Sequence, residues 1–163
     1  MTSQENTSLP VRSLQVARIL AEAGIAGQVR ELTTPARTAA EAADALGCEI
    51  GAIANSLIFI SDDEPVLVLT SGRHKVDTIA LATRWGRGKL RRATPEQVRQ
   101  ATGQAIGGVA PVGHPKPLPT VVDSALTEYR QLWAAAGTPH TIFPTTASEL
   151  LHLTGALLLP VGP

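Results

Sequence analysis

The sequence predicts an α/β (α+β) protein with one mixed, barrel-like β-sheet that is surrounded by helices. Short segments rich in Val, Ile, Leu and Thr alternate irregularly with segments whose apolar residues recur at helical spacing. Three of the helical segments open with a capping sequence, Thr-x-x-Glu or Thr-x-x-Gln. The regular strand–helix alternation and the glycine-rich fingerprint of a dinucleotide-binding fold are missing, so a doubly wound parallel sheet is not expected.

Apolar periodicity, together with glycine and proline stops, places the individual elements. In chain order we expect a helix at 13–23, a strand at 28–32, a helix at 38–47, strands at 56–60 and 66–70, a helix at 76–85, a short strand around 90, a helix that starts at 94, strands at 118–122, 131–135 and 141–143, and a last helix that starts at 146. Ser13 is expected to cap the first helix, and Thr38, Thr94 and Thr146 open capping boxes. The sequence Asp62-Asp63-Glu64-Pro65 is typical of a hairpin turn.

Length and composition indicate one domain. The 163 residues are 44% hydrophobic but only 3% aromatic, so Ala, Leu, Val and Ile must build the core. No apolar run approaches the roughly 20 residues that a membrane span needs, and the N-terminus lacks a signal-peptide pattern. The single cysteine, Cys48, excludes an internal disulfide and fits a reducing cytoplasm. We expect a flexible tail at 1–12, the domain at 13–157 and a C-terminal tail at 158–163.

The stretch from Ile106 to Pro119 is the clearest candidate for a functional loop. It holds three glycines and four of the twelve prolines, so neither a helix nor a central strand can form there. The adjacent Gly107 and Gly108 let the backbone approach a ligand and direct successive N–H groups into one concavity. A rigid surface connection is the alternative interpretation. The loop also carries His114, follows a capped helix and leads into an apolar strand, and this setting favours a function.

The common catalytic signatures are absent from the sequence. There is no Gly-x-Ser-x-Gly, P-loop or His-Glu-x-x-His sequence, and Cys48 has no histidine near it in the chain. His114 and His140 lie in connections rich in Gly and Pro, where functional residues gather, whereas His74 is expected to be solvated. Two histidines alone would leave a metal ion under-coordinated, so neither a metal nor a cofactor is expected.

Charge is balanced overall but unevenly distributed. The formal net charge of zero argues against a nonspecific nucleic-acid binder, and neither DNA nor a membrane is expected as a partner. Half of the fourteen Lys and Arg residues nevertheless lie between 73 and 92. This basic stretch is either a solvated face or a patch that touches a few phosphates. The candidates for phosphate contact are Arg73, Lys75, Arg87, Lys89 and Arg91.

Several segments carry a family resemblance in their order along the chain. They are Asn55-Ser-Leu-Ile-Phe59, Val66-Leu-Val-Leu69, Thr102-Gly103 with the following Ile106–His114, and Trp133-Ala-Ala-Ala-Gly137. As an ordered set they resemble the YbaK/prolyl-tRNA-synthetase-associated family, from about Ser13 to Gly155. The resemblance implies a mixed β-barrel with surrounding helices. It also implies an aminoacyl-tRNA deacylase that hydrolyses wrongly attached amino acids in trans, in association with the translation machinery.

The resemblance further implies a mechanism without a protein nucleophile. Backbone N–H groups of Gly107 and Gly108 would hold the ester carbonyl oxygen where negative charge develops, and one such donor is worth roughly 3 kcal/mol of barrier. The catalytic residues implied are Gly107, Gly108, Asn55 and His114. The substrate-binding residues implied are Ser56, Val109, Pro111, Gly113, Ala135, Gly137 and His140. The basic stretch would hold the acceptor end of the tRNA.

Asn55 departs from the family pattern, which typically has a lysine at this position. Asparagine keeps hydrogen-bond donors but loses the positive charge and about two atoms of reach. Two functions therefore follow from the sequence. The first is a deacylase for tRNA that carries a small amino acid such as alanine, cysteine or serine. The second is a catalytically impaired module that binds tRNA or a small ligand. A hydrolase of other small acyl esters is a third interpretation.

Overall fold

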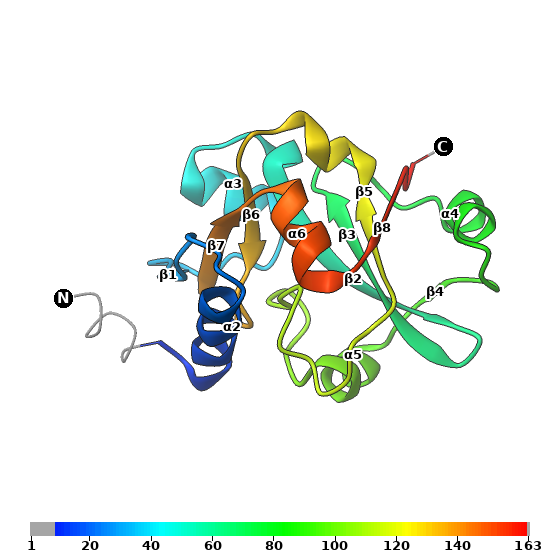
Figure 1. Ribbon diagram of the computed structural model, residues 1–163, viewed down its shortest axis with the longest axis horizontal. Coiled ribbons are helices and arrows are strands. Elements are labelled where there is room, and N and C mark those ends of the chain that lie inside the picture. Colours follow the sequence, from blue (N-terminus) through cyan, green and yellow to red (C-terminus); the bar gives the residue numbers. More distant parts are fainter. Residues whose placement is uncertain (1–8, 163) are drawn as a thin grey trace.

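The computed structural model describes residues 9–162, so most of the expected tail at 1–12 lies outside the described residues (Figure 1). The strands are β1 Arg30–Glu31, β2 Ile53–Ser61, β3 Glu64–Ser71, β4 Arg91–Arg92, β5 Thr120–Asp123, β6 Leu132–Ala135, β7 Thr141–Thr145 and β8 Leu157–Leu159. The α-helices are α2 Val11–Glu22, α3 Ala39–Leu46, α4 Thr78–Trp85, α5 Pro95–Thr102 and α6 Ala147–Thr154. Short 3₁₀ helices occupy Ile50–Ala52 and Ser124–Glu128.

One mixed sheet of eight strands organises the described residues. Its order is β1-β7-β6-β2-β3-β5-β8, and β4 pairs with β2 beside this path. The expected mixed sheet with surrounding helices is confirmed, but the expected closure into a barrel is wrong. The path ends at β1 and β8, which are only two and three residues long. Strands this short offer few main-chain groups for closing a sheet.

Successive side chains of each strand point to opposite faces of the sheet, and helices cover both faces. On β2, Ile58 packs in one cluster with buried residues of α2, α5 and α6. Its neighbour Phe59 points to the opposite face and packs with Leu81 of α4. Ile53, at the start of β2, shares this second face and packs with Ala42 and Ala43 of α3. In Figure 1, α6 lies in front of the sheet and α4 lies at the end of the molecule beside β8.

The three predicted helix starts are confirmed. The hydroxyls of Thr38, Thr94 and Thr146 each accept the N–H of the residue three positions later. Only the helix that starts after Thr94 has the full reciprocal box, in which the Gln97 side chain accepts the Thr94 N–H. In α3 the Glu41 carboxylate instead accepts the N–H of Arg37.

Ser13 is not the cap of the first helix. The helix already begins at Val11, after Pro10, whose fixed φ suits the residue that precedes a helix. Ser13 therefore lies inside α2, fully buried, and its hydroxyl contacts Thr141 on β7 at 2.8 Å. A residue that sequence alone assigns to local capping thus links a helix to the sheet.

The β2–β3 hairpin turns where the sequence predicts. Ser61 pairs with Glu64, so Asp62 and Asp63 form a two-residue turn. Both have positive φ values, 52° and 62°, as a type I′ turn requires. This tight turn aligns eight pairs of residues from Ala54 to Ser71 and makes β2 the longest strand of the sheet.

The C-terminal residues also join the sheet. β8 pairs in parallel with β5, and Val161 beyond it is fully buried. The Arg84 guanidinium donates to the carbonyl oxygens of Pro160 and Gly162 at 3.0 and 2.6 Å. The sequence does not predict this strand.

Candidate active site

One edge of β2 is paired at both ends and open between them. On this edge β6 runs parallel to Ile53–Ala54, and β4 runs antiparallel to Phe59–Ile60. The Ala93 N–H donates to the Ile58 carbonyl oxygen at 3.1 Å, so the main chain of Ile58 faces this edge. Because main-chain groups alternate along a strand, those of Ser56 face it too. No described strand pairs with Ser56 on this side, and its N–H and C=O therefore border a gap.

A cavity of about 40 Å³ opens at this gap. About 10 to 15 Å³ of such space holds one water molecule, so the cavity is small and suits a short side chain. The walls come from the start of α3, the start of β2, the glycine loop, β6 and the turn before β7. The lining residues are Ala36, Arg37, Thr38, Ala39, Ala42, Ile53, Ala54, Asn55, Ser56, Gly107, Val109, Trp133, Ala134, Ala135, Thr138, Thr141 and Ile142.

Asn55 and Ser56 give the cavity free polar groups. The Oγ of Ser56 is buried and has no hydrogen-bond partner, which is costly unless a ligand or water supplies one. The described residues also provide no partner for the Asn55 amide. Arg37 is the only charged residue in the lining, which contains no histidine, cysteine or carboxylate. The described cavity therefore offers hydrogen bonds but no nucleophile–base pair.

The glycine loop contributes main-chain donors, though not the pair expected from the sequence. Gly107 and Val109 line the cavity, and the described residues offer no main-chain partner for either N–H. The Gly108 N–H instead donates to the Ala105 carbonyl oxygen at 3.1 Å. Gly108 also packs against the Thr138–Pro139 backbone, where a Cβ atom would come within 2.7 Å of the Pro139 nitrogen. Gly108 thus holds two loops together, whereas Gly107 and Val109 line the cavity and keep main-chain N–H groups without a main-chain partner among the described residues.

A buried glutamine, which sequence reasoning missed, fixes the same loop. The Gln104 Oε1 accepts the Ala110 N–H at 2.7 Å, and its Nε2 donates to the Val112 carbonyl oxygen at 3.4 Å. The His114 Nε2 donates to the Ala110 carbonyl oxygen at 2.8 Å. Burial lowers the pKa of His114, and the smaller effect of this hydrogen bond raises it. The only sequence signal for Gln104 is a polar residue directly after the helix stop Thr102-Gly103.

The structure brings some of the expected site residues together and separates others. Those that line the cavity are Asn55, Ser56, Gly107, Val109 and Ala135. Those that do not are Gly108, Pro111, Gly113, His114, Gly137 and His140. Pro111, Gly113 and His114 border a different hollow, against Ile19 and Leu153. The His140 side chain is exposed, and its carbonyl oxygen accepts the Leu32 N–H at 2.6 Å.

The sequence also missed the threonines of the cavity. Thr38, Thr138 and Thr141 line it: Thr38 is the N-cap of α3, Thr138 lies in the turn before β7, and Thr141 begins β7. Thr138 follows Gly137, which has a φ of 107° and turns the chain from β6 toward β7. A hydroxyl next to a turn glycine is too common a pattern to identify a site by itself.

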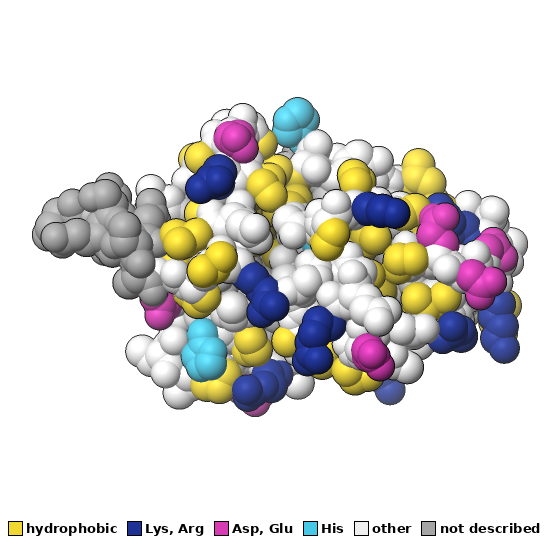
Figure 2. All heavy atoms as spheres, turned by 90° about the horizontal axis from the view of Figure 1, so that it is seen from below, with side chains coloured by type: hydrophobic (Ala, Val, Ile, Leu, Met, Phe, Trp, Pro, Cys, Tyr) yellow, Lys and Arg dark blue, Asp and Glu magenta, His cyan; other side chains and the backbone are white. Residues whose placement is uncertain are grey.

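The basic stretch divides into paired and exposed residues. Arg73 contacts the Glu128 carboxylate at 2.6 Å, and Arg87 contacts Glu64 at 3.6 Å and lies over the Trp85 ring. Lys75, Lys89, Arg91 and Arg92 are exposed and have no acidic partner among the described residues. Figure 2 shows basic side chains spaced across the face seen from below, with acidic and apolar ones between them. β4 pairs with β2 at Phe59, and Asn55 lies four residues earlier, about 13 Å along an extended strand.

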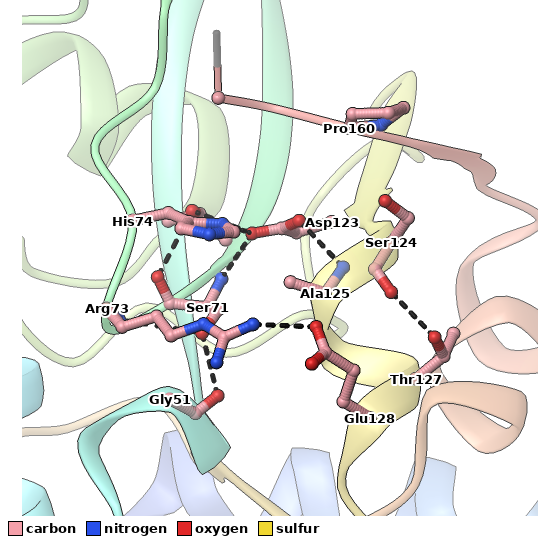
Figure 3. Close-up of polar contacts among 12 residues, drawn as sticks. Gly51, Ser71, Arg73, His74, Asp123, Ser124, Ala125, Thr127, Glu128 and Pro160 are labelled. Carbon is pink, nitrogen blue, oxygen red and sulfur yellow. Dashed lines mark hydrogen bonds and ion pairs between the residues drawn. The ribbon is translucent and has the colours of Figure 1, made fainter.

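His74 is not solvated as expected, because it joins a buried carboxylate (Figure 3). Its Nδ1 lies 2.8 Å from Oδ2 of Asp123, which is 1% exposed. The same oxygen accepts the Ser71 N–H at 2.9 Å, and Oδ1 accepts the Ala125 N–H at 3.0 Å. These bonds tie the end of β3 to the end of β5. None of these four residues lines the cavity.

Residues 9–162 contain neither a candidate metal site nor a membrane-spanning helix. No group of three or more His, Cys, Asp or Glu side chains is placed to hold a metal ion. None of the described helices has the length and apolar character needed to cross a bilayer.

The chain is similar in sequence to known proteins. The sequence model of the aminoacyl-tRNA editing domain matches residues 33–153, which include every residue of the cavity lining. Protein YwhH of Bacillus subtilis (strain 168) is 30% identical over 123 residues, covering 75% of this chain and 78% of YwhH. The proline–tRNA ligase of Nitratidesulfovibrio vulgaris (strain DP4) is 36% identical over 89 residues, and the match spans 54% of this chain but only 16% of the ligase.

A solved structure is similar over nearly the whole chain. It is a crystal structure of a candidate trans-editing enzyme for prolyl tRNA synthetase. The two share 44% sequence identity and superpose with a TM-score of 0.88, over 95% of this chain and 99% of the other.

Proposed function

The chain belongs to the aminoacyl-tRNA editing domain family, and from this membership we propose that it is a deacylase that removes a small, wrongly attached amino acid from tRNA in trans. The observation that carries the proposal is the cavity of about 40 Å³ beside the open edge of β2. It combines alanine walls with unpartnered hydrogen-bonding groups. Its proposed partner is the acceptor end of tRNA, and its proposed setting is the cytoplasm, beside the translation machinery.

The proposed reaction is hydrolysis of the ester between the amino acid and the terminal ribose. Water adds to the carbonyl carbon, the bond to the ribose oxygen breaks, and the products are a free amino acid and a tRNA with a free hydroxyl. The Gly107 and Val109 N–H groups are the proposed donors that stabilise the carbonyl oxygen as it becomes negative, and their position in the cavity lining supports this role. Since the described lining has no base, the neighbouring ribose hydroxyl is the proposed aid to the attacking water.

Asn55 and Ser56 are the proposed anchors of the substrate. An α-ammonium group needs acceptors, and the cavity offers the buried Ser56 Oγ and the Ser56 carbonyl oxygen at the gap. The Asn55 amide, which has both a donor and an acceptor, suits the ribose hydroxyls. Ala135 and its neighbours leave room for the side chain of alanine, serine or cysteine and crowd larger ones.

Binding of the tRNA backbone requires positive charge at and around the cavity. Arg37 lies in the cavity lining, and Lys75, Lys89 and Arg91 are exposed in the basic stretch. Phosphate contacts by such residues supply affinity and make binding dependent on salt. We include Arg73 and Arg87 in the proposed tRNA surface only at its margin, because acidic residues already pair with them.

The test is ester hydrolysis by the purified protein. A panel of tRNAs charged with alanine, serine, cysteine, proline, valine and leucine is incubated with substoichiometric protein, and loss of the ester is followed over time. We expect multiple turnovers on the small residues and little or none on valine and leucine. A rate equal to that in buffer on every small-residue pair would refute the proposal.

A binding module is the second candidate function. It is favoured by Asn55, which replaces the family's lysine, and by the absence of a nucleophile–base pair from the described lining. This module would bind the charged tRNA in a salt-dependent manner and leave the ester intact. The same incubation separates the two candidates, because turnover excludes a pure binding module.

A further inference from the structure

Three hydroxyl groups form a continuous chain that ends at the cavity. The Ser13 Oγ, on α2, lies 2.8 Å from the Thr141 Oγ1 on β7. The Thr141 Oγ1 lies 2.9 Å from the Thr138 Oγ1, in the turn before β7. Ser13 and Thr141 are fully buried, whereas Thr138 is half-buried, and both threonines line the cavity.

The buried end of this chain sets the direction of its protons. Thr141 is the only partner of the Ser13 hydroxyl among the described residues. If Ser13 accepted from Thr141, its own O–H would be buried without an acceptor. If Ser13 donates, only the lone pairs of its oxygen remain unused, which costs less free energy. Ser13 therefore donates to Thr141.

The Thr141 hydroxyl in turn donates its hydrogen bond to Thr138. Thr141 has two acceptors within reach, the Thr138 Oγ1 at 2.9 Å and the Thr138 carbonyl oxygen at 3.5 Å. Bonds between a hydroxyl and an oxygen are usually about 2.5 to 3.0 Å long. The carbonyl oxygen also already accepts the Thr141 N–H, at 3.3 Å. The shorter contact is the better bond, and Thr141 donates to the Thr138 hydroxyl.

Thr138 is left with a proton and no free lone pair. Its Oγ1 accepts from Thr141 and also from the His140 N–H at 3.2 Å. A hydroxyl has two acceptor sites and one donor, so only the O–H remains to face the cavity. We propose that the chain Ser13–Thr141–Thr138 makes Thr138 a dedicated hydrogen-bond donor to the carbonyl oxygen of the bound aminoacyl ester. Ser13 and Thr141 are its positioning residues.

The ligand in this inference rests on the proposed function, but the direction of the chain does not. Neutron diffraction from hydrogen–deuterium-exchanged crystals reads that direction without any substrate. We expect the Ser13 deuteron to point at Thr141, the Thr141 deuteron at the Thr138 Oγ1, and the Thr138 deuteron into the cavity. A Thr138 deuteron that points at Thr141 would overturn the inference.

A ligand that cannot be hydrolysed tests the donor itself. The probe is 3′-(L-alanylamino)-3′-deoxyadenosine, an amide analogue of the end of alanyl-tRNA, with binding measured by calorimetry. Thr138→Val keeps the shape and removes the O–H, and we expect it to weaken probe binding about tenfold. Thr138→Ser restores the donor and should bind within about threefold of the wild type. The matched control is Thr154→Val, which removes a half-buried threonine hydroxyl bonded only within α6.

The outcomes separate this inference from the proposed function. Equal probe binding by the wild type and Thr138→Val, with unchanged melting temperatures, would overturn the role of Thr138. Failure of Thr138→Ser to restore binding would overturn it as well. A wild type that binds the probe through Thr138 but hydrolyses no charged tRNA would refute the deacylase while supporting this donor.

Discussion

The Nε2 atom of His114 lies 2.8 Å from the carbonyl oxygen of Ala110, in the loop that carries Gly107 and Val109 into the cavity. The Ala110 N–H is held at the same time by the buried Gln104 side chain, at 2.7 Å. Side chains therefore hold both the N–H and the C=O group of Ala110. His114 lies outside the cavity lining, and we expect it to influence the site only through the loop.

His114 makes the stability of the protein depend on pH. Burial lowers its pKa from the ordinary value of 6.5, so the folded state binds fewer protons than the unfolded state between the two pKa values. The contribution of His114 to the free energy of unfolding is therefore fully present above pH 6.5. It is lost as the pH falls from 6.5 through the lower pKa of the folded state. His114→Gln should reduce the difference between the free energies of unfolding that urea titrations give at about pH 5 and pH 7.5. The exposed His152 is the control, and His152→Gln should leave the slope unchanged.

Gly108→Val should destabilise the fold by about 2 kcal/mol or more, because the added atoms meet backbone and not a flexible side chain. A Cβ on Gly108 would come within 2.7 Å of Thr138 and of the Pro139 nitrogen. Gly162→Val is the control, since a Cβ there meets nothing within 4 Å. Thermal and urea unfolding provide the measurement. Equal stability of the two variants would show that the loops do not depend on this contact.

Substitutions at Asn55 should separate the contribution of its N–H donors to activity from the contribution of its size. Asn55→Ala should lower kcat/KM about tenfold, as expected for the loss of one hydrogen bond to the substrate. Asn55→Asp keeps the shape but removes the N–H donors and adds a charge, so its loss should be larger. Asn55→Lys keeps donors and should be the most active of the three. Steady-state hydrolysis of the preferred charged tRNA gives the ranking, and full activity of Asn55→Asp would contradict the assigned role.

Arg37 and Arg91 should each contribute a phosphate contact to tRNA binding. Arg37→Ala and Arg91→Ala should each reduce the log–log salt slope of tRNA affinity by roughly 0.7 to 0.9. Arg18→Ala is the matched control, because Arg18 is exposed on α2, which packs on the other face of the sheet from α3. Affinities measured across a range of salt concentrations check this. An equal change of slope in Arg18→Ala would indicate that tRNA affinity depends on the overall charge of the protein and not on a defined surface.

Local physics determined what the sequence alone could predict. The hydroxyls of Thr38, Thr94 and Thr146 bond to N–H groups three residues away, so each helix start is encoded in a few adjacent positions. The Asp62-Asp63 turn likewise depends on neighbours in the chain. The glycine–proline loop and the segment around Asn55 were also identified from short motifs, which together indicate the family.

Long-range pairing decided the rest. The gap at Ser56 exists because β6 and β4, far apart in the chain, occupy the same edge of β2 and leave its middle open. The same arrangement places Gly107 at the cavity and His114 at another hollow, although the two are only seven positions apart in the chain. Ser13 and Thr141 meet across 128 positions, and only packing of α2 on β7 aligns their hydroxyls. Register and burial are properties of the assembled sheet, and no stretch of residues encodes them by itself.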